Sequence, residues 1–307
     1  MSSGCRLYET LALTCLLASC GGTGEAPPQR DNVIASNGGI SDSGGSTATV
    51  AGVGGTTTID VDAGVVQNVD EECDNVLDVT YRDFEASHPD MERDFAGDVV
   101  RHNLVEPTLG SDNKPVFMSS VGCPRVAETT STPEQCDNWQ VTEPVIESAE
   151  TFDQWYRSLP DVNIEFQRTL ELVDVGGGQY EYDSTSFFPL GPDEGYGVAP
   201  TPDHHLGKNF LFTTEIHVRF RYDSGRVFSF RGDDDLWIFV NGRLAMDLGS
   251  MHAAEEGIID FDAQASVLGI TPGQSYAMDI FHAERHTLES NFRFQTNISC
   301  FEPVVIK

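Results

Sequence analysis

Hydrophobic and polar residues alternate along several short segments in the second half of the chain. The segment 216–222, IHVRFRY, places four apolar side chains on one face of an extended chain, and 292–298, FRFQTNI, alternates in the same way. The segments 226–230, RVFSF, and 276–284, YAMDIFHAE, complete a set of short apolar runs separated by Gly and Pro signals. These patterns predict short β-strands.

One run departs from alternation. Segment 236–240, LWIFV, is apolar at every position, which is typical of a strand buried on both faces, and the turn dipeptide Asn241-Gly242 follows it. A helix is expected at Thr151–Leu159, with Thr151 as its N-cap. Together these elements predict an all-β fold, a β-sandwich with short helical insertions.

The first residues have the features of an export signal. Leu11–Ser19 is apolar but too short to span a bilayer, and Leu17-Ala18-Ser19-Cys20 resembles a bacterial lipobox. That resemblance implies a lipoprotein signal peptide at residues 1–19, lipidation of Cys20 and attachment to the membrane through the lipid anchor only. Gly21 is compatible with passage to the outer membrane, so we expect an exported protein at the cell surface. An ordinary secretory leader is the alternative.

A low-complexity segment follows. Residues 20–72 are rich in Gly, Ser and Thr, with few charges and no aromatic residue. Such a composition cannot bury enough apolar surface to offset the conformational entropy of the chain. It predicts a flexible, disordered tether, which leaves residues 73–307 for the folded domain.

The charge balance restricts the partners. The chain carries 49 Asp and Glu against 18 Lys and Arg, a formal charge of -31. This charge opposes binding to nucleic acid and to anionic lipid. It is compatible with divalent cations, with neutral glycans, or simply with solubility.

Four cysteines remain once the leader and Cys20 are set aside. They are Cys73, Cys123, Cys136 and Cys300, an even number that fits an oxidising compartment. Of the three possible pairings we favour Cys73 with Cys300 and Cys123 with Cys136, because antiparallel terminal strands would bring the first pair together. A zinc site made from all four is the alternative, although the chain has no C-x-x-C spacing.

An ordered series of motifs gives a specific resemblance. The fragments are RDF at 82–84, then HPDME, SDNKPVF, FDQWYRSLPDVN, FFPL, NFLFTTEIHVRFRY, FSFRGDDDLWIFVNGRLAMDLGSMH and YAMDIFHAERHTLESNFRFQT. In this order they resemble the fibro-slime domain, over roughly residues 77–299. The central part is similar to the anthrax protective antigen fourteen-kilodalton domain superfamily, a β-sandwich shared with flocculins and epithelial adhesins.

The resemblance implies a calcium site. Sugar-binding members of that superfamily hold calcium with two adjacent Asp residues before a strand that ends in Asp/Asn-Gly, which corresponds here to Asp233 and Asp234. Successive side chains of a strand point to opposite faces, so a cis peptide between the two residues would be needed to bring both carboxylates to one ion. Asn241, Asp247 and Glu284 are candidate further ligands because of their proximity in the motif.

Two further residues of the same motif are candidates for ligand binding, namely Asp235, which follows the acid pair, and His252. The implied function is a calcium-dependent, carbohydrate-binding adhesin at the cell surface. Alternatively, the acid pair has a structural role and its charge is met by Arg231 or Arg243.

Other sites were weighed against this one. His282, Glu284 and His286 would share one face of a strand and could hold a transition metal, or they have structural roles only. A glycoside hydrolase could use Asp235 with Glu284 as paired carboxylates. No G-x-S-x-G elbow or phosphate-binding Gly loop is present, so we expect a binding protein rather than an enzyme, or else a structural matrix module without a ligand.

Overall fold

The chain divides into two units, residues 1–69 and 70–307. The computed structural model describes residues 48–52, 55–60, 65–68, 75–93, 99–125, 143–198, 207–286 and 289–304. The leader, Cys20, Cys73 and Cys136 lie outside these residues.

The first unit contains one small antiparallel sheet. Its strand order is β1 (Ala48–Gly52), β2 (Gly55–Asp60) and β3 (Val65–Asn68). These strands fall within the segment that composition predicts to be a flexible tether. β-branched residues are frequent here, as in Thr-Thr-Thr-Ile of β2, and such residues favour extended structure. This part of the predicted tether therefore has regular secondary structure.

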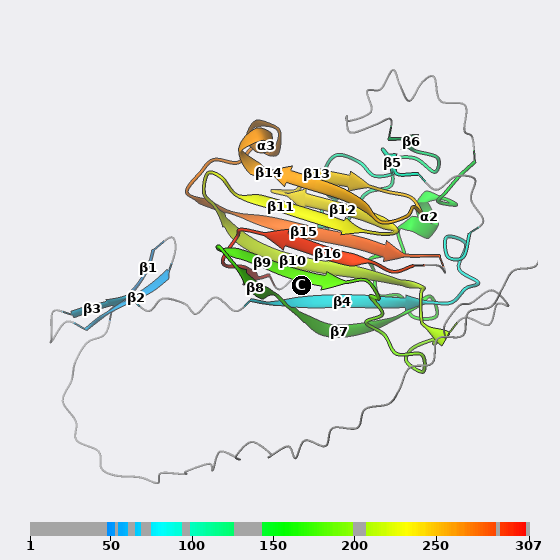
Figure 1. Ribbon diagram of the computed structural model, residues 1–307, viewed down its shortest axis with the longest axis horizontal. Coiled ribbons are helices and arrows are strands. Elements are labelled where there is room, and N and C mark those ends of the chain that lie inside the picture. Colours follow the sequence, from blue (N-terminus) through cyan, green and yellow to red (C-terminus); the bar gives the residue numbers. More distant parts are fainter. Residues whose placement is uncertain are drawn as a thin grey trace, which may run out of the picture. The chain divides into compact units, whose positions relative to one another are not determined.

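The second unit is a β-sandwich of two antiparallel sheets that lie face to face (Figure 1). The large sheet has the order β13 (Arg243–Leu248), β12 (Asp235–Val240), β15 (Gln274–Glu284), β10 (Phe212–Tyr222), β4 (Val76–Phe84) and β7 (Asn163–Glu171), and β17 (Glu302–Pro303) also pairs with β10. The small sheet has the order β14 (Glu255–Asp260), β11 (Val227–Gly232), β16 (Phe292–Thr296), β9 (Gln179–Ser184) and β8 (Val173–Gly176). The predicted all-β sandwich is confirmed.

The main core lies between the two sheets. The alternation in β10 sets its contribution, because Ile216, Val218, Phe220 and Tyr222 are all buried in this core. The intervening Arg219 is exposed, as the sequence pattern predicts. Residues from both sheets complete the core, among them Val79, Phe228, Leu236, Ile238, Met278, Phe292 and Phe294.

Strand β12 is buried on both faces, which explains its continuous apolar run. Leu236, Ile238 and Val240 belong to the core between the sheets, whereas Trp237 and Phe239 belong to a second cluster on the outer face of the large sheet. A covering layer packs against that outer face and supplies residues between 104 and 156 to the second cluster. This layer contains the short strands β5 (Arg101–His102) and β6 (Cys123–Pro124) and the helix α2 (Ala149–Phe152).

A buried charge network also joins the covering layer to the large sheet. Glu215 on β10 pairs with Arg82 on β4 at 2.6 Å, and it also contacts Lys114 of the covering layer and His217. His217 in turn contacts Asp279 on β15 at 2.7 Å. The cluster contains two cations and two carboxylates around one imidazole, so its charges largely compensate one another.

The predicted helix is shorter than expected and has a different cap. Helix α2 spans Ala149–Phe152, and its N-cap is Ser148, whose hydroxyl accepts a hydrogen bond from Thr151 N. Thr151 is instead the third helical residue, and its side chain accepts from Ser148 N in a reciprocal capping box. The prediction of Thr151 as the cap is wrong because both residues are good caps and the pattern did not separate them.

The predicted turn after β12 is confirmed, since Asn241 (φ 53°) and Gly242 (φ 71°) both adopt the left-handed conformation that joins β12 to β13. Cys123 and Cys300 each take part in a disulfide bond. The partners that we favoured, Cys136 and Cys73, lie outside the described residues, so the pairing stays a prediction. No helix in the described part of the chain is long and apolar enough to cross a membrane.

Candidate functional site

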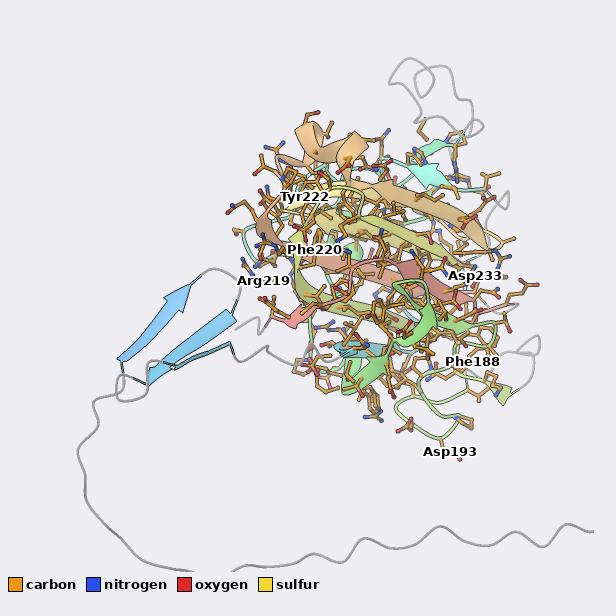
Figure 2. All side chains as sticks on the ribbon, turned by 60° about the vertical axis from the view of Figure 1, so that its left-hand side comes forward. Phe188, Asp193, Arg219, Phe220, Tyr222 and Asp233 are labelled. Atoms are coloured by element: carbon orange, nitrogen blue, oxygen red, sulfur yellow. The ribbon has the colours of Figure 1, made fainter. Side chains whose placement is uncertain are left out.

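The three adjacent acids lie where the chain passes from the small sheet to the large one. Asp233 and Asp234 follow the last residue of β11, and Asp235 is the first residue of β12. The peptide bond between Asp233 and Asp234 is cis, as expected for an acid pair that shares one site. Figure 2 shows Asp233 toward one end of the domain, with Arg219 of β10 toward the other.

Asp233 is held by one residue that sequence reasoning missed. Asn291 donates from its backbone N to one carboxylate oxygen of Asp233 and from Nδ2 to the other, both at 2.6 Å. Asn291 immediately precedes β16, so it comes from a loop late in the sequence. Burial raises the pKa of Asp233, and the two hydrogen bonds from Asn291 oppose that rise.

Asp235 has a different environment, in a buried ion pair. Arg285 Nε lies 2.7 Å from one oxygen of Asp235, both side chains have no exposed surface, and Ser250 N donates to the other oxygen at 2.6 Å. The Arg285 guanidinium lies 4.6 Å from the ring centre of Trp155. Asp235 is therefore not available to a ligand, and the prediction that it binds one is wrong.

Arg285 is also the cation that compensates the acid run, in place of Arg231 or Arg243. Its backbone N donates to Asp234 at 3.0 Å. Arg231 is exposed on β11 opposite Arg293, and Arg243 contacts the carbonyl of Val267. The alternative of an arginine partner thus named the right residue type and the wrong residue, because Arg285, directly after the end of β15, lies 50 residues from Asp235 along the chain.

Glu284 is the unusual member of the site. It is the last residue of β15, and since Asp235 pairs with Ala283, Glu284 lies beside Asp234. Its side chain has no exposed surface, and its carboxyl lies within hydrogen-bonding reach of the Asp234 carboxyl and the Ser290 hydroxyl, although neither contact has good hydrogen-bond geometry. The nearby Ser290 hydroxyl is engaged with the carbonyl of Phe187.

The electrostatics of this cluster favour a bound cation. Burial, followed by the charges of Asp234 and Asp233, raises the pKa of Glu284 well above its usual range. Burial likewise raises the pKa of Asp234, although the charge of Arg285 opposes the rise. An unpaired buried carboxyl beside two other acids costs free energy unless it is protonated or meets a cation. Asp233, Asp234 and Glu284 thus lie close enough to affect one another's ionisation, and we call them the acid cluster.

Two candidate ligands lie elsewhere. Asn241 is at the far end of β12, a distance of about 20 Å for six extended residues, and its amide donates to the carbonyls of Leu268 and Gly269. Asp247 is on β13, where it accepts from Asn103 N and Trp237 Nε1, both at 3.0 Å. The length of β12 separates Asn241 from the acid cluster, whereas Asp247 pairs opposite Trp237 and lies with it on the outer face of the large sheet.

The histidines have structural contacts. Buried His252 makes contacts through its ring nitrogens with the carbonyls of Ala253 at 2.8 Å and Leu248 at 3.3 Å. His282 is fully buried, and its Nε2 donates to the carbonyl of Asp233 at 2.7 Å. Burial lowers the pKa of His282 to about 4, so the imidazole is neutral.

The proposed transition-metal set is not assembled. β15 ends at Glu284, so His286 does not continue the strand face of His282 and Glu284. In the described part of the chain, no three His, Cys, Asp or Glu side chains form a metal-binding group by themselves. A cation at the acid cluster would accordingly need oxygen ligands of other kinds, such as backbone carbonyls and amides.

Asp235 and Glu284 are not placed as the two carboxylates of a glycoside hydrolase, which lie on either side of a sugar cleft. Asp235 and Glu284 both have no exposed surface. Because Asp235 lies opposite Ala283, alternation along β15 places Glu284 on the other face of the sheet. These two carboxylates do not flank a common cleft.

Comparison with known proteins finds relatives of this chain but no matching family model. Protein psiD of Dictyostelium discoideum is 35% identical over 232 residues, which cover 73% of this chain and 41% of psiD. Protein psiR of the same organism is 31% identical over 229 residues, covering 71% of this chain and 20% of psiR. The chain thus spans less than half the length of these curated relatives.

Among solved structures, similarity is found to the PA14 sugar-binding domain from an RTX adhesin, at 13% identity and a TM-score of 0.22, over 32% of this chain and 52% of that one. The PA14 domain of the antifreeze protein MpAFP matches at 13% identity and a TM-score of 0.24, over 39% of this chain and 64% of that one.

Proposed function

We propose that the sandwich is a calcium-dependent carbohydrate-binding module that acts as an adhesin at the cell surface. The observation that carries this proposal is the acid cluster, in which the buried Glu284 lies beside Asp233 and Asp234 and is affected by the charges of both. The acid pair occurs in the motif whose resemblance to sugar-binding members of the protective antigen superfamily is described above. The closeness of the three acids in space and the motif resemblance therefore both support a site at Asp233 and Asp234.

Calcium suits this cluster better than other common cations. It is a hard ion that takes 6–8 oxygen ligands in flexible geometry, including carboxylates, amide oxygens and backbone carbonyls. Asp233, Asp234 and Glu284 would supply carboxylates. Asn291 replaces Asn241 as the candidate amide, because it comes from a later loop and already contacts Asp233.

The ligand that we propose is a neutral carbohydrate. Hydroxyl oxygens of a sugar can complete the coordination of a calcium ion, and a neutral glycan avoids repulsion by the formal charge of -31. Asp234 is 7% and Asp233 3% exposed, so the acid pair is nearly buried and is the part of the acid cluster nearest to solvent. We propose binding without turnover, since Asp235 and Glu284 are not exposed to a common cleft.

The test is a glycan array probed with the folded chain, in about 5 mM calcium, which is above the Kd range of extracellular calcium modules, and again in chelator. We expect binding to a restricted set of neutral glycans that disappears in chelator and in the Asp234→Asn variant. Each bound glycan is then incubated with the protein and analysed for products. Release of reducing ends would show turnover and refute the adhesin proposal. Binding that is equal in calcium and chelator would remove the role of the metal, and no binding at all would favour a structural matrix module.

A further inference from the structure

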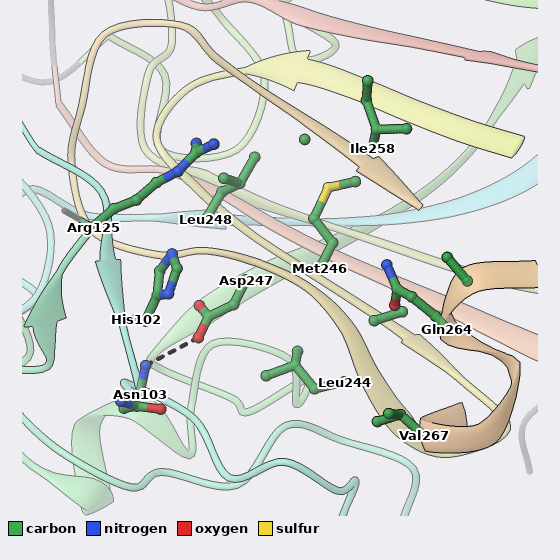
Figure 3. A pocket seen from close by; sticks show the side chains of 13 residues that line it. His102, Asn103, Arg125, Leu244, Met246, Asp247, Leu248, Ile258, Gln264 and Val267 are labelled. Atoms are coloured by element: carbon green, nitrogen blue, oxygen red, sulfur yellow. Dashed lines mark hydrogen bonds between the residues drawn. The ribbon is translucent and has the colours of Figure 1, made fainter. Parts of the chain in front are cut away.

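A groove opens at the side of the sandwich, away from the acid cluster. It has a volume of about 520 Å³ and lies between the edge strands β13 and β14, with the helix α3 (Phe261–Leu268) at one end and the residues around His102 at the other (Figure 3). The two strands approach closely here, because a Cβ added at Gly257 of β14 would lie 2.7 Å from Met246 Sδ of β13. The groove is therefore the seam where the two sheets meet at their edges.

The walls of this seam groove are aliphatic. Leu244, Met246 and Leu248 line it from β13, Ile258 from β14 and Val267 from α3. Ile258 and Val267 are 60% and 65% exposed, on two different elements that border the groove. No Phe, Tyr or Trp of the described residues lines it. The groove thus offers burial to aliphatic side chains and no flat aromatic ring for stacking.

The backbone beside the groove has free hydrogen-bonding capacity. Within the described chain, β14 pairs with β11 only. β13 is bridged at its two ends, where Leu244 N donates to the carbonyl of Pro107 at 2.9 Å and Arg101 N donates to the carbonyl of Gly249 at 2.7 Å. Every second residue of an edge strand directs its N–H and C=O away from its partner, which is the template for addition of another strand.

The charges at the groove are mostly acidic. Glu255 and Glu256 are exposed on β14, and Asp247 lies within the lining. Arg125 also lines the groove, but it lies 3.7 Å from Glu255 and is compensated by it. Asp247 is hydrogen-bonded, and burial raises its pKa to about 7, so the exposed Glu256 is the acid that favours a ligand with positive charge.

We propose that the seam groove docks an extended basic peptide segment of a partner protein. The segment adds to the free edge of β14 through main-chain hydrogen bonds. Alternate aliphatic side chains enter the groove between Met246 and Val267, and the intervening lysine or arginine side chains face Glu256, which lies on the outer face of β14. Strand addition combines backbone pairing with pockets for alternate side chains, and the seam groove provides both.

The probe is a fluorescein-labelled octapeptide in which valine alternates with lysine, and binding to the folded chain is followed by fluorescence polarisation. The salt concentration is about 0.3 M, so that long-range attraction by the acidic surface is screened. We expect saturable binding at this salt concentration. The same peptide with N-methylated valines, which cannot donate hydrogen bonds to the edge, should not bind.

Two exposed positions locate the site. Ile258→Ser and Val267→Ser should each weaken binding about 10-fold, since each removes aliphatic surface that the peptide buries. Both side chains are more than half exposed, so neither substitution threatens folding. Val173→Ser is the matched control, because Val173 is 61% exposed on β8, the opposite edge of the small sheet, and this variant should bind as the unmodified chain does.

Three results would overturn the proposal. Equal binding of the N-methylated peptide would show attraction by charge alone. An equal loss of affinity in Val173→Ser would place the peptide elsewhere. Displacement of the peptide by hexylamine at similar concentration would assign the groove to a small cationic ligand. Because none of these measurements uses calcium or a glycan, their outcome is independent of the proposed carbohydrate function.

Discussion

At the residue scale, three adjacent aspartates have three different environments. Asp233 is held by Asn291, Asp234 meets the backbone N of Arg285, and Asp235 forms a buried ion pair with the Arg285 side chain. Asp235 therefore has a structural role, in an ion pair, whereas Asp233 and Asp234 belong to the acid cluster. Asp235 fixes the start of β12 through Arg285, and the preceding pair lies beside Glu284, where the charge of Arg285 offsets only part of the acid charge.

The ion pair leads to a prediction about stability. Asp235→Asn leaves the charge of Arg285 buried without a carboxylate, and breaking a buried pair in this way costs about 3–5 kcal/mol. We expect a loss of that size in the free energy of unfolding, measured with urea in chelator. Asp183→Asn is the control, since Asp183 is 49% exposed and lies 3.8 Å from Arg293, and it should cost less than about 1 kcal/mol. Equal losses in the two variants would contradict the role of Asp235.

The acid cluster leads to a prediction about calcium. Extracellular calcium modules bind with Kd around 10⁻⁴–10⁻³ M, so ~10 mM calcium is roughly 100 Kd at the tight end and stabilises by ~2.7 kcal/mol. For a domain of ~150–250 residues this corresponds to a rise in Tm of roughly 5–10 °C. Magnesium should give a smaller rise, because it demands a tighter octahedron and resists dehydration.

A single substitution tests whether the acid cluster causes this rise. Glu284→Gln keeps the size of the side chain and removes the buried acid, so it should abolish the calcium effect while Tm in chelator stays the same or increases. Glu194→Gln changes an exposed acid, 42% exposed and paired with Arg168, and should keep the full effect. If thermal melts of the unmodified chain coincide in calcium and in chelator, the metal proposal is wrong.

Sequence reasoning reached part of this site and missed the rest for a physical reason. The acid pair and its cis peptide were predicted because they lie in one short motif. Asn291 and the pairing of Arg285 with Asp235 were not predicted, because strand pairing brings residues together that are 58 and 50 positions apart. Asn241 was assigned to the cluster by its nearness in the sequence, and the length of β12 separates it.

At the scale of the elements, the large sheet is buried on both faces and its two faces are held differently. Trp237 and Phe239 pack into the apolar cluster beneath the covering layer, whereas Glu215 and His217 fasten the same layer by charge. The run LWIFV predicted burial on both faces of β12 correctly. The alternating pattern of β10 did not reveal that its polar face is covered too, because Glu215 is only 2% exposed and is paired by residues distant in the sequence.

The charge network leads to a pH prediction. Burial opposes ionisation of Glu215, but the hydrogen bond from His217 and the charges of Arg82, His217 and Lys114 lower its pKa from 4.5 to about 2. A lowered carboxyl pKa stabilises the folded state fully above pH ~4.5, and that stabilisation is lost as the pH falls toward 2. The shift corresponds to about 3 kcal/mol at ~1.4 kcal/mol per pKa unit.

Glu215→Gln should therefore be less stable than the unmodified chain at pH ~6 by about 3 kcal/mol, and the difference should shrink to near zero by pH ~2. Urea unfolding at a series of pH values measures this difference in the free energy of unfolding. The raised pKa of His217, which its hydrogen bonds to Asp279 and Glu215 sustain against burial, gives the opposite trend. Its contribution is present below pH ~6.5 and is lost as the pH rises through the raised value. A difference between the variant and the unmodified chain that does not change between pH 6 and 2 would contradict the network.

At the scale of the whole molecule, the cysteines and the first 20 residues bear on the cellular location of the protein. Cys123 and Cys300 each take part in a disulfide, which is consistent with an exported protein. We propose that the chain is held at the cell surface through lipid on Cys20, so that the sandwich can meet carbohydrate outside the cell. This proposal rests on Leu17-Ala18-Ser19-Cys20 alone and needs its own test.

Partition between detergent and water measures the anchor directly. A lipidated protein enters the detergent phase of Triton X-114, because each buried CH₂ of an acyl chain contributes about 0.8 kcal/mol. Cys20→Ser removes the thiol that receives the lipid, so the variant should either appear in the aqueous phase or remain as uncleaved precursor. Cys15→Ser is the matched control, since it changes a cysteine inside the expected signal peptide and should leave partition unchanged. A processed, unmodified chain found in the aqueous phase would exclude the lipid anchor and favour an ordinary secretory leader, while the glycan and calcium experiments on the folded domain would retain their meaning.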